Sequence, residues 1–329
     1  MKTKISFITF SLVLMMVSLF AGMVIHKYKP YQVLRSPKKS GTSDVKKSSG
    51  FTSWSIGIYS GSSLLNLADS LNTKNPVLKA ADVTDIEAAF VADPFVLHTD
   101  SKYYMFFEVL NKKDKQGDIG VAESTDGKNW KYKQIVLDEK FHLSYPYVFE
   151  WNHNFYMIPE SHQDLSVRLY KASAFPTRWE YMGDLLKGYH FVDSSIIRYK
   201  NKWWLFVSIP ENDVLNLYFS DKLMGPWKQH PLSPVVKHNK HIARCGGRLL
   251  KIENKLYRFA QDDDPTYGNQ VHAFEIVEMT ETAYREKLVS DSPVVKATAS
   301  GWNALGMHHV DVFQTSKIEW LAVVDGFDK

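Results

Sequence analysis

The sequence predicts an all-β protein, a five-bladed β-propeller preceded by an N-terminal transmembrane helix. Four-stranded units recur about every 50 residues between 51 and 329, which is typical of propeller blades. Residues 5–25 form a stretch of 21 residues without a charged side chain, about the length that spans a bilayer. These observations divide the chain into a signal anchor at 1–25, a basic flexible stalk at 26–50 and a propeller at 51–329.

The basic charge of the chain is concentrated in its first 50 residues. They carry nine of the 40 Lys and Arg residues and one of the 36 Asp and Glu residues, a net charge of +8, so the remainder has a net charge of −4. A mildly acidic propeller has no overall attraction for phosphate backbones, and we expect no nucleic-acid partner.

The uncharged stretch at 5–25 favours a signal anchor over a cleaved signal peptide. It is longer than a typical signal-peptide core, and no clear small-residue cleavage site follows it. The Ser-, Lys- and Gly-rich segment 36–50 is typical of a flexible stalk. We therefore expect a single-pass membrane protein whose propeller lies on the lumenal or extracytoplasmic side.

Each unit begins with a short apolar run and returns after a turn as an aromatic run, and the first four units continue into two further strands. The β-branched and aromatic content and the Gly, Pro, Asp and Asn turns indicate strands. The expected third and fourth strands are 119–123 and 131–137, 167–171 and 180–186, 215–220 and 234–236, and 271–277 and 293–295. The fifth unit has only two strands, and the runs 54–59 and 76–79 are expected to complete it and close the ring. Two stacked β-sandwiches would not produce this regular return of an aromatic second strand.

Polar residues recur where first strands begin and second strands end. In a propeller these ends lie on one face, around one mouth of the central channel. The residues expected there are Asp93, Glu108, Ser144, Tyr145, Glu160, Asp193, Arg244, Gln261, Asp262, His308, His309 and Asp325. Strand ends are often polar for structural reasons alone, but converging carboxylates shift one another's pKa values, which is typical of a functional site.

We expect four of these acids to be catalytic: Asp93, Asp193, Glu160 and Glu108. The expected substrate-binding residues are Tyr145, Arg244, Gln261, Asp262, His308, His309 and Asp325. Arg244 is the cation best placed to hold an anionic group or a carboxylate. His308 and His309 are adjacent on a predicted strand and should point to opposite faces, so no metal site and no cofactor is predicted. Cys245 has no activating motif around it and is expected to be inert.

Two motifs resemble the family 43 glycoside hydrolases and related furanosidases. They are Ala-Asp-Pro-Phe at 92–95 and Ser-Thr-Asp-Gly-Lys-Asn-Trp at 124–130. The recurrence of five blade-like units resembles these families as well. The resemblance implies that Asp93 is a general base and that Asp193 tunes the acid. The glutamate that serves as general acid in that family is absent from blade four, where 243–248 reads Ala-Arg-Cys-Gly-Gly-Arg. This departure argues against ordinary hydrolase activity.

A longer series of motifs is similar to the N-terminal domain of plant glucosamine inositolphosphorylceramide transferases. The series covers nearly all of 51–329 and includes Leu-Ser-Tyr-Pro-Tyr-Val-Phe at 143–149, Tyr-Met-Ile-Pro-Glu at 156–160 and Gly-Met-His-His-Val-Asp at 306–311. The family adds an amino sugar to a sphingolipid headgroup through a domain C-terminal to this one. The resemblance therefore implies a glycan or glycolipid context rather than transferase activity in this chain.

Three functions are compatible with these patterns. The first is a membrane-anchored enzyme that hydrolyses or transfers a sugar with paired carboxylates, whose separation would set retention or inversion. The second is a non-catalytic glycan-binding module that assists a partner glycosyltransferase. The third, a protein-interaction propeller, leaves the clustered acids unexplained.

Overall fold

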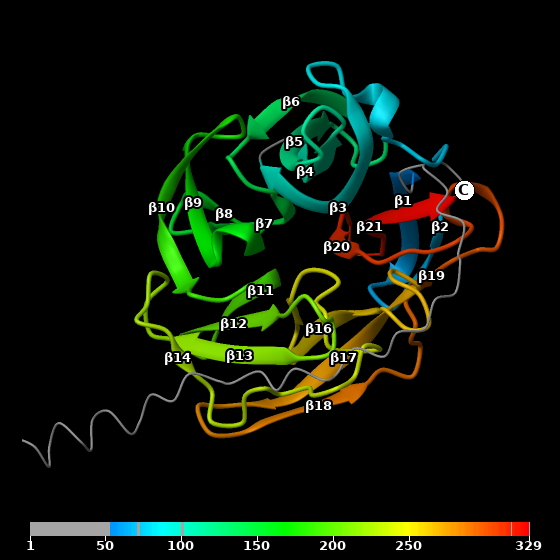
Figure 1. Ribbon diagram of the computed structural model, residues 1–329. Helices are drawn as coiled ribbons and strands as arrows, with labels where there is room; N and C mark the ends of the chain where they lie inside the picture. Colours follow the sequence, from blue (N-terminus) through cyan, green and yellow to red (C-terminus); the bar gives the residue numbers. More distant parts are fainter. Residues whose placement is uncertain (1–52, 71–72, 100–101, 317, 329) are drawn as a thin grey trace, which may run out of the picture. The chain divides into compact units, whose positions relative to one another are not determined.

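The computed structural model describes residues 53–70, 73–99, 102–316 and 318–328, and its strands form five antiparallel sheets arranged around a central axis (Figure 1). The first sheet contains β3 (Ala88–Thr99), β4 (Lys102–Asn111), β5 (Gly117–Ser124) and β6 (Lys131–Leu137). The second contains β7 (Ser144–Trp151), β8 (Asn154–Ser161), β9 (Ser166–Ala174) and β10 (Arg178–Lys187). The third contains β11 (Val192–Tyr199), β12 (Lys202–Ser208), β13 (Leu215–Ser220) and β14 (Lys228–Gln229). The predicted five-bladed propeller is confirmed.

The fourth and fifth sheets complete the ring. The fourth contains β15 (Leu250–Ile252), β16 (Lys255–Asp262), β17 (Gln270–Met279) and β18 (Tyr284–Leu288), with β19 (Val295–Lys296) also on β17. The fifth contains β20 (Val310–Gln314), β21 (Trp320–Asp328), β1 (Ser53–Ser63) and β2 (Asn66–Asp69). Three short 3₁₀ helices occur in the described part of the chain: η1 (Ala80–Asp82), η2 (His162–Asp164) and η3 (Gly301–Asn303).

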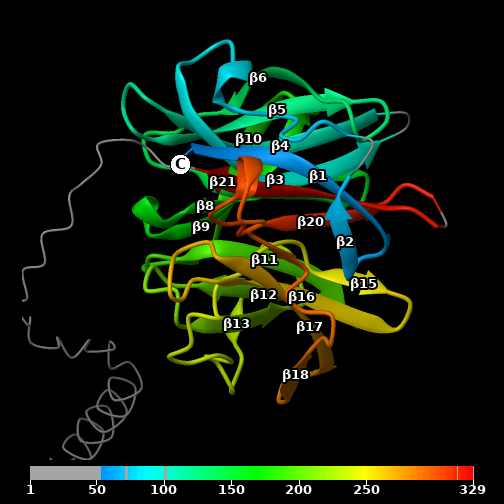
Figure 2. The same ribbon diagram turned by 90° about the vertical axis from the view of Figure 1, so that its right-hand side faces the viewer.

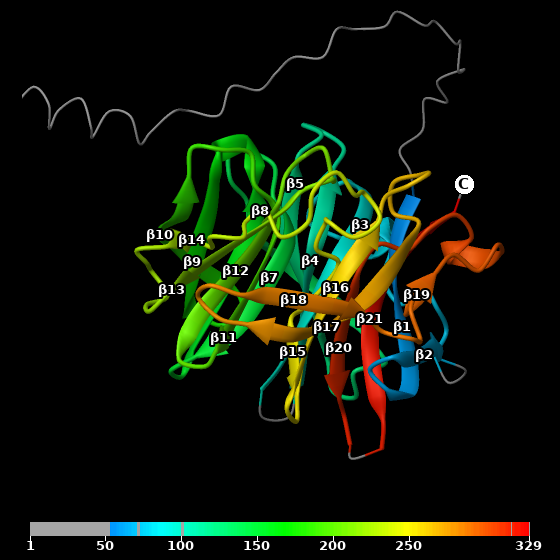
Figure 3. The ribbon, with the colours of Figure 1, turned by 90° about the horizontal axis from the view of Figure 1, so that it is seen from below.

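The ring closes by pairing the first described strand with the last. β1 and β21 are antiparallel over nine residue pairs from Ser53↔Asp328 to Gly61↔Trp320, and Figures 2 and 3 show them alongside β20. Closure by N-terminal strands is as predicted, but the outermost strand is β2. The predicted strand at 76–79 is wrong, because only Leu78 bridges to Ile56 there.

Two other outer strands also differ from the prediction. The outer strand of blade three is β14, whereas Val236 in the predicted run only bridges to Leu215. The outer strand of blade four is β18, and the Val-Val run near 295 pairs with a different part of β17. An outer strand is exposed on one edge and carries charged side chains, so the apolar Val-Val runs were misleading indicators.

Arg248, which lies just before β15 of blade four, forms hydrogen bonds with residues of three other blades, one, two and five. Its Nε donates to Asp311 Oδ1 of blade five at 2.8 Å, its Nη1 to the Val148 carbonyl of blade two at 2.6 Å, and its Nη2 to the Val96 carbonyl of blade one at 3.2 Å. Buried aromatic side chains such as Phe106 and Phe206 fill the space between blades. The inner strands are thereby fixed relative to one another, which positions the groups at their ends.

Within the described ranges, no helix has the length and apolar character needed to cross a bilayer. The predicted anchor at 5–25 and stalk at 26–50 lie outside the described residues.

Candidate functional site

Three consecutive blades have a residue with positive φ at a β-bulge near the start of the inner strand. Asp93, Tyr145 and Asp193 have φ values of 53°, 44° and 44°, and each lies at an interruption of the pairing between the first and second strands of its blade. A positive φ at a non-glycine residue is strained and is maintained only when the surroundings impose it. The repeated bulge therefore places strained backbone at the mouth in three successive blades.

A hollow of about 180 Å³ opens at this mouth. Its lining residues are Trp54, Phe90, Ala92, Asp93, Glu108, His142, Ser144, Glu160, Arg244, Tyr267 and His308. The predicted residues Asp93, Glu108, Ser144, Glu160, Arg244 and His308 are thus brought together. Tyr145, Asp193, Gln261, His309 and Asp325 do not line the hollow but contact residues that do, or lie near them.

Asp93 presents an unsatisfied oxygen. Its Oδ2 accepts a hydrogen bond from the Tyr145 backbone N–H at 3.3 Å, whereas its Oδ1 is buried and has no hydrogen-bond partner in the described part of the chain. Burial, reinforced by the charge of Asp325, raises the pKa of Asp93 to about 6, although the His308 imidazolium opposes the shift. A buried carboxylate oxygen without a hydrogen-bond partner is costly, and this oxygen belongs to a residue that lines the hollow.

Asp325 anchors the two histidines behind Asp93. Its Oδ1 accepts from the backbone N–H groups of His308 and His309 and from His308 Nδ1 at 2.8 Å, and its Oδ2 accepts from the Asp93 N–H at 3.0 Å. Burial alone would lower the pKa of His308, but the carboxylates of Asp325 and Asp93 raise it to about 9. His308 is therefore an imidazolium at neutral pH.

The prediction that His308 and His309 point to opposite faces is wrong. Their ring nitrogens lie 3.7 and 3.8 Å from the same Asp93 Oδ1. The alternation expected of a strand does not apply because β20 begins only at Val310. Burial lowers the pKa of His309 to about 4, so its ring is neutral.

A second network joins blades two, three and four. Arg244 Nε donates to Asp193 Oδ2 at 2.6 Å, Gln261 Nε2 donates to the same oxygen at 2.8 Å, and Arg244 Nη2 lies 3.6 Å from Glu160 Oε2. His162 Nδ1 lies 2.7 Å from Glu160 Oε1. Burial alone would raise the pKa of Glu160, but His162 and Arg244 hold it at about 2. Arg244 thus binds protein carboxylates, one of the two roles predicted for it.

Glu108 is in the opposite situation. Its Oε1 lies 3.5 Å from His142 Nε2, and among the described residues no lysine or arginine pairs with it. Burial, followed by the charges of Asp93 and Glu160, raises the pKa of Glu108 well above its usual value. His142 Nδ1 accepts the Gly117 backbone N–H at 2.9 Å, and burial lowers the pKa of His142. A neutral ring of this kind supplies no positive charge to oppose the rise in the pKa of Glu108.

Trp54, Phe90, His142 and Tyr267 line the hollow but were not predicted. Trp54 stacks on His308 with ring centroids 4.0 Å apart, and the Arg244 guanidinium lies over the Tyr267 ring at 5.4 Å. Trp54 lies on a strand that the sequence assigns correctly to blade five, so its position near the mouth could have been inferred. His142 and Tyr267 are on loops, and no sequence pattern indicates where those loops fold.

Asp262 is the predicted site residue that lies in a separate cluster. Its Oδ1 lies 2.8 Å from His241 Nδ1, and its Oδ2 accepts from Gln270 Nε2 at 2.8 Å and lies 3.3 Å from His272 Nε2. It does not line the hollow. The side chain is satisfied within its own blade, so its predicted role in substrate binding is not supported.

One group at the mouth could hold a cation. Asp93, His308 and Asp325 each offer a ligand atom, all within 4.8 Å of one another. Both Asp325 oxygens already accept backbone N–H groups, and His308 Nδ1 is bonded to Asp325. The hydrogen bonds occupy both Asp325 oxygens and His308 Nδ1, whereas Asp93 Oδ1 has no hydrogen-bond partner among the described residues.

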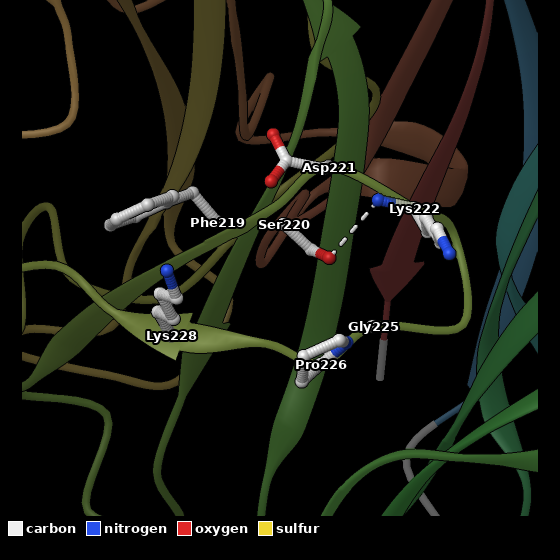
Figure 4. Close-up of a pocket in the computed structure, with 7 residues that line it drawn as sticks. All are labelled: Phe219, Ser220, Asp221, Lys222, Gly225, Pro226 and Lys228. Atoms are coloured by element: carbon white, nitrogen blue, oxygen red, sulfur yellow. Dashed lines mark hydrogen bonds between the residues drawn. The ribbon is translucent and has the colours of Figure 1, made fainter.

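Two other hollows have less suitable chemistry. One of about 140 Å³ at the outer edge of blade three lies between Phe219, Lys228 and the Gly225–Pro226 turn (Figure 4). The Asp221 carboxylate at its wall pairs with Lys202 at 2.6 Å. A wider hollow of about 730 Å³ at the edge of blade five has Lys79 and Asp328 as its titratable groups. Neither brings together unpaired buried acids as the mouth does.

Residues 46–327 match the family model described as glucosamine inositolphosphorylceramide transferase 1, N-terminal. The chain is 37% identical over 300 residues to glucosamine inositolphosphorylceramide transferase 1 of Oryza sativa subsp. japonica, covering 84% of this chain and 40% of the relative. It is 35% identical over 299 residues to the protein of the same name from Arabidopsis thaliana, covering 83% and 39%. The chain therefore matches about two fifths of the length of these curated relatives.

Solved structures with a similar fold include glycoside hydrolases. A putative glycoside hydrolase from Parabacteroides distasonis aligns with a TM-score of 0.58 at 10% identity, over 79% of this chain and 96% of that one. The catalytic domain of the Coprinopsis cinerea GH62 alpha-L-arabinofuranosidase aligns with a TM-score of 0.56 at 12% identity, over 83% and 97%. At these identities the similarity supports the fold alone.

Proposed function

The chain belongs to the family of the N-terminal domain of glucosamine inositolphosphorylceramide transferase 1, and from this we propose that its mouth hollow acts on a sugar of a glycan or glycolipid by carboxylate acid–base chemistry. The observation that carries the proposal is the pair of lining carboxyl groups, Asp93 and Glu108, with which no lysine or arginine pairs in the part of the chain that the structure describes. Polyhydroxylated ligands suit such groups, because each carboxylate accepts hydrogen bonds from hydroxyls.

The environments of the lining acids separate their roles. Glu108, with its raised pKa, serves as the proton donor to the departing oxygen. Asp93 ionises near pH 6 and serves as the base that activates water or an acceptor hydroxyl, or as the nucleophile. Two acids whose surroundings push their protonation apart form the pattern of a general acid and a general base.

The remaining charges are fixed by the protein. Glu160 stays ionised beside His162 and Arg244, and Asp193 holds Arg244 in place. The catalytic role expected of Glu160 and the tuning role that the resemblance implies for Asp193 are therefore replaced, in this proposal, by electrostatic support. We also propose that residues 5–25 anchor the chain in a membrane and that the propeller lies on the lumenal or extracytoplasmic side. Its sugar chemistry would then serve the biosynthesis of a glycolipid or polysaccharide.

The test is turnover by the purified full-length chain. It is incubated with glycolipids extracted from the source membrane, and released or transferred sugars are followed by mass spectrometry. Asp93→Asn and Glu108→Gln should each lower the rate by about 100-fold or more, whereas Asp262→Asn, in the separate cluster of blade four, should retain it. Turnover that is equal in all four proteins would contradict the proposal.

A second candidate is a glycan-binding module that assists a partner glycosyltransferase. It is favoured by Arg244, which stands in blade four where the resemblance to hydrolases leads one to expect the acid, and which pairs with Asp193. This candidate predicts that a sugar stabilises the protein without being converted.

A further inference from the structure

The loops around the mouth carry exposed apolar side chains. Among the described residues, ten large hydrophobic side chains are exposed, and four of them lie on loops at the mouth: Leu165, Tyr189, Tyr267 and Leu305. These loops precede inner strands or follow second strands, at the ends where Asp93 and Glu108 lie. The opposite face has two such residues on its loops, Met224 and Ile318.

The four side chains, which we call the mouth rim, belong to two pairs of adjoining loops. The Gly188 N–H next to Tyr189 donates to the Leu165 carbonyl at 2.7 Å. Gly268, next to Tyr267, and Gly306, next to Leu305, also lie close together. A Cβ on Gly306 would be 2.3 Å from the Gly268 carbonyl oxygen. Each pair thus brings one exposed aliphatic and one exposed aromatic residue onto adjoining loops at the mouth.

The first blade contributes a different surface to the same face. The turn between β4 and β5 presents the exposed side chains of Lys112, Lys113 and Lys115, with the exposed Asp114 among them and Lys112 paired with Glu87. Tyrosine has an apolar ring and a polar hydroxyl and suits the boundary between lipid and water. Lysine is attracted to anionic headgroups. A face that carries exposed apolar side chains on its loops and lysines on another turn suits a bilayer surface better than a soluble polysaccharide.

The described chain also begins at this face. Ser53 pairs with Asp328, and Trp54, the next residue, lines the hollow. The 52 residues that precede Ser53 include the uncharged stretch at 5–25. The chain therefore enters the propeller beside the mouth rather than at the opposite face.

We propose that the mouth rim docks on a lipid bilayer, so that the hollow receives the headgroup of a glycolipid directly from the membrane surface. This inference rests on the proposed function, since it identifies the source of the sugar. Partial insertion of Leu165, Tyr189, Tyr267 and Leu305 would remove apolar surface from water and would bring Asp93 and Glu108 to headgroup depth.

The test uses the full-length chain in vesicles of phosphatidylcholine and anionic phosphatidylserine that contain lipids spin-labelled on the acyl chain. Cys245 is buried, so single cysteines can be introduced and labelled selectively with a fluorophore. Leu165→Cys and Leu305→Cys report on the mouth, and Met224→Cys and Ile318→Cys are matched controls on exposed apolar residues of the opposite face. We expect quenching at least several-fold stronger at 165 and 305. Equal quenching on both faces, or stronger quenching at 224 and 318, would overturn the proposal.

A second measurement separates docking from sugar recognition. The double variant Leu165→Ser/Leu305→Ser should lose most of its turnover, or its binding if no turnover occurs, on vesicle-embedded glycolipid, and should retain wild-type behaviour on the free headgroup glycan. Met224→Ser/Ile318→Ser should retain both. If the free glycan is recognised but the rim variant also works normally on vesicles, docking is wrong and the proposed function stands. If the wild type recognises neither substrate, the proposed function fails.

Discussion

Arg244 of blade four lies with its Nε 2.6 Å from Asp193 Oδ2 of blade three, and only 14% and 1% of the two side chains are exposed. A cation therefore occupies the start of blade four, and its partner is the acid that was expected to tune a catalytic glutamate there. The pair makes the third and fourth blades an electrostatic support. Asp93 and Glu108 of blade one are then the lining acids with which no lysine or arginine of the described residues pairs.

Removing Arg244 should be costly because it leaves buried carboxylates without their cation. Arg244→Gln is expected to lower the free energy of unfolding by about 3–5 kcal/mol, measured by urea denaturation. Arg244→Gln/Asp193→Asn should recover part of that loss. Arg285→Gln, which removes an exposed partner of Glu278 at 3.8 Å, should cost less than about 1 kcal/mol. An Arg244 variant as stable as the Arg285 control would contradict the assignment.

The His308–Asp325 pair should make stability depend on pH on the alkaline side. Because the pKa of His308 rises from 6.5 to about 9 on folding, its stabilising contribution is fully present below pH 6.5 and is lost as pH rises through about 9. Urea denaturation across this window should show a decline in the wild type that is reduced in His308→Gln. His238→Gln, at a side chain that is 87% exposed, should keep the wild-type decline. A His308 variant with an unchanged slope would exclude this role.

Turnover at the mouth should have an acid limb set by Asp93. Its pKa of about 6 means that the carboxylate base is lost as the pH falls below 6, and the rate should fall with it. His308→Gln removes the cation that lowers this pKa, so the acid limb should move to higher pH. The measurement is kcat/KM against pH for both proteins. An identical acid limb in the variant would show that His308 does not act on Asp93.

Gly247 should not tolerate a side chain. Its φ is 153°, and a Cβ would lie 2.0 Å from the Val310 carbonyl oxygen, where blades four and five meet by a parallel bridge. Gly247→Ala is expected to cost at least about 2 kcal/mol through backbone strain and overlap. Gly188→Ala, at a φ of 95° with no atom within 4 Å, should cost about 1 kcal/mol through strain alone. Thermal denaturation would compare the two, and equal losses would contradict the packing argument.

The sequence was sufficient for the ring because its signal is repeated. An aromatic second strand recurs in each repeat, and its side chains, such as Phe106 and Phe206, are buried between blades. This recurrence predicts the ring of blades. The outer strands β14 and β18 were missed because an edge strand buries little and carries no distinct apolar alternation. Asp93, Glu108 and Glu160 were placed correctly at the mouth by topology alone.

Their partners could not be predicted in the same way. The raised pKa of Glu108 and the ionisation of Glu160 depend in part on which histidine stands beside each carboxylate. His142 is on a loop and His162 begins the 3₁₀ helix η2, and no sequence pattern places either side chain at the mouth. The error at His308 and His309 has a similar origin. The alternation of side chains along a strand does not apply to them, because both residues precede Val310, where β20 begins.

The central claim is that a sugar occupies the hollow between Asp93 and Glu108, and thermal unfolding in the presence of sugars tests it most directly. A ligand that binds the native state raises Tm, and the stabilisation grows with the logarithm of the ligand concentration divided by Kd when the ligand is in excess. We predict that at least one member of a panel of neutral and amino sugars and inositol glycosides raises the Tm of the wild type. We further predict that Asp93→Asn and Glu108→Gln abolish the shift and that Asp262→Asn retains it. A panel that leaves the wild-type Tm unchanged, or a shift that persists undiminished in both mouth variants, would contradict the account.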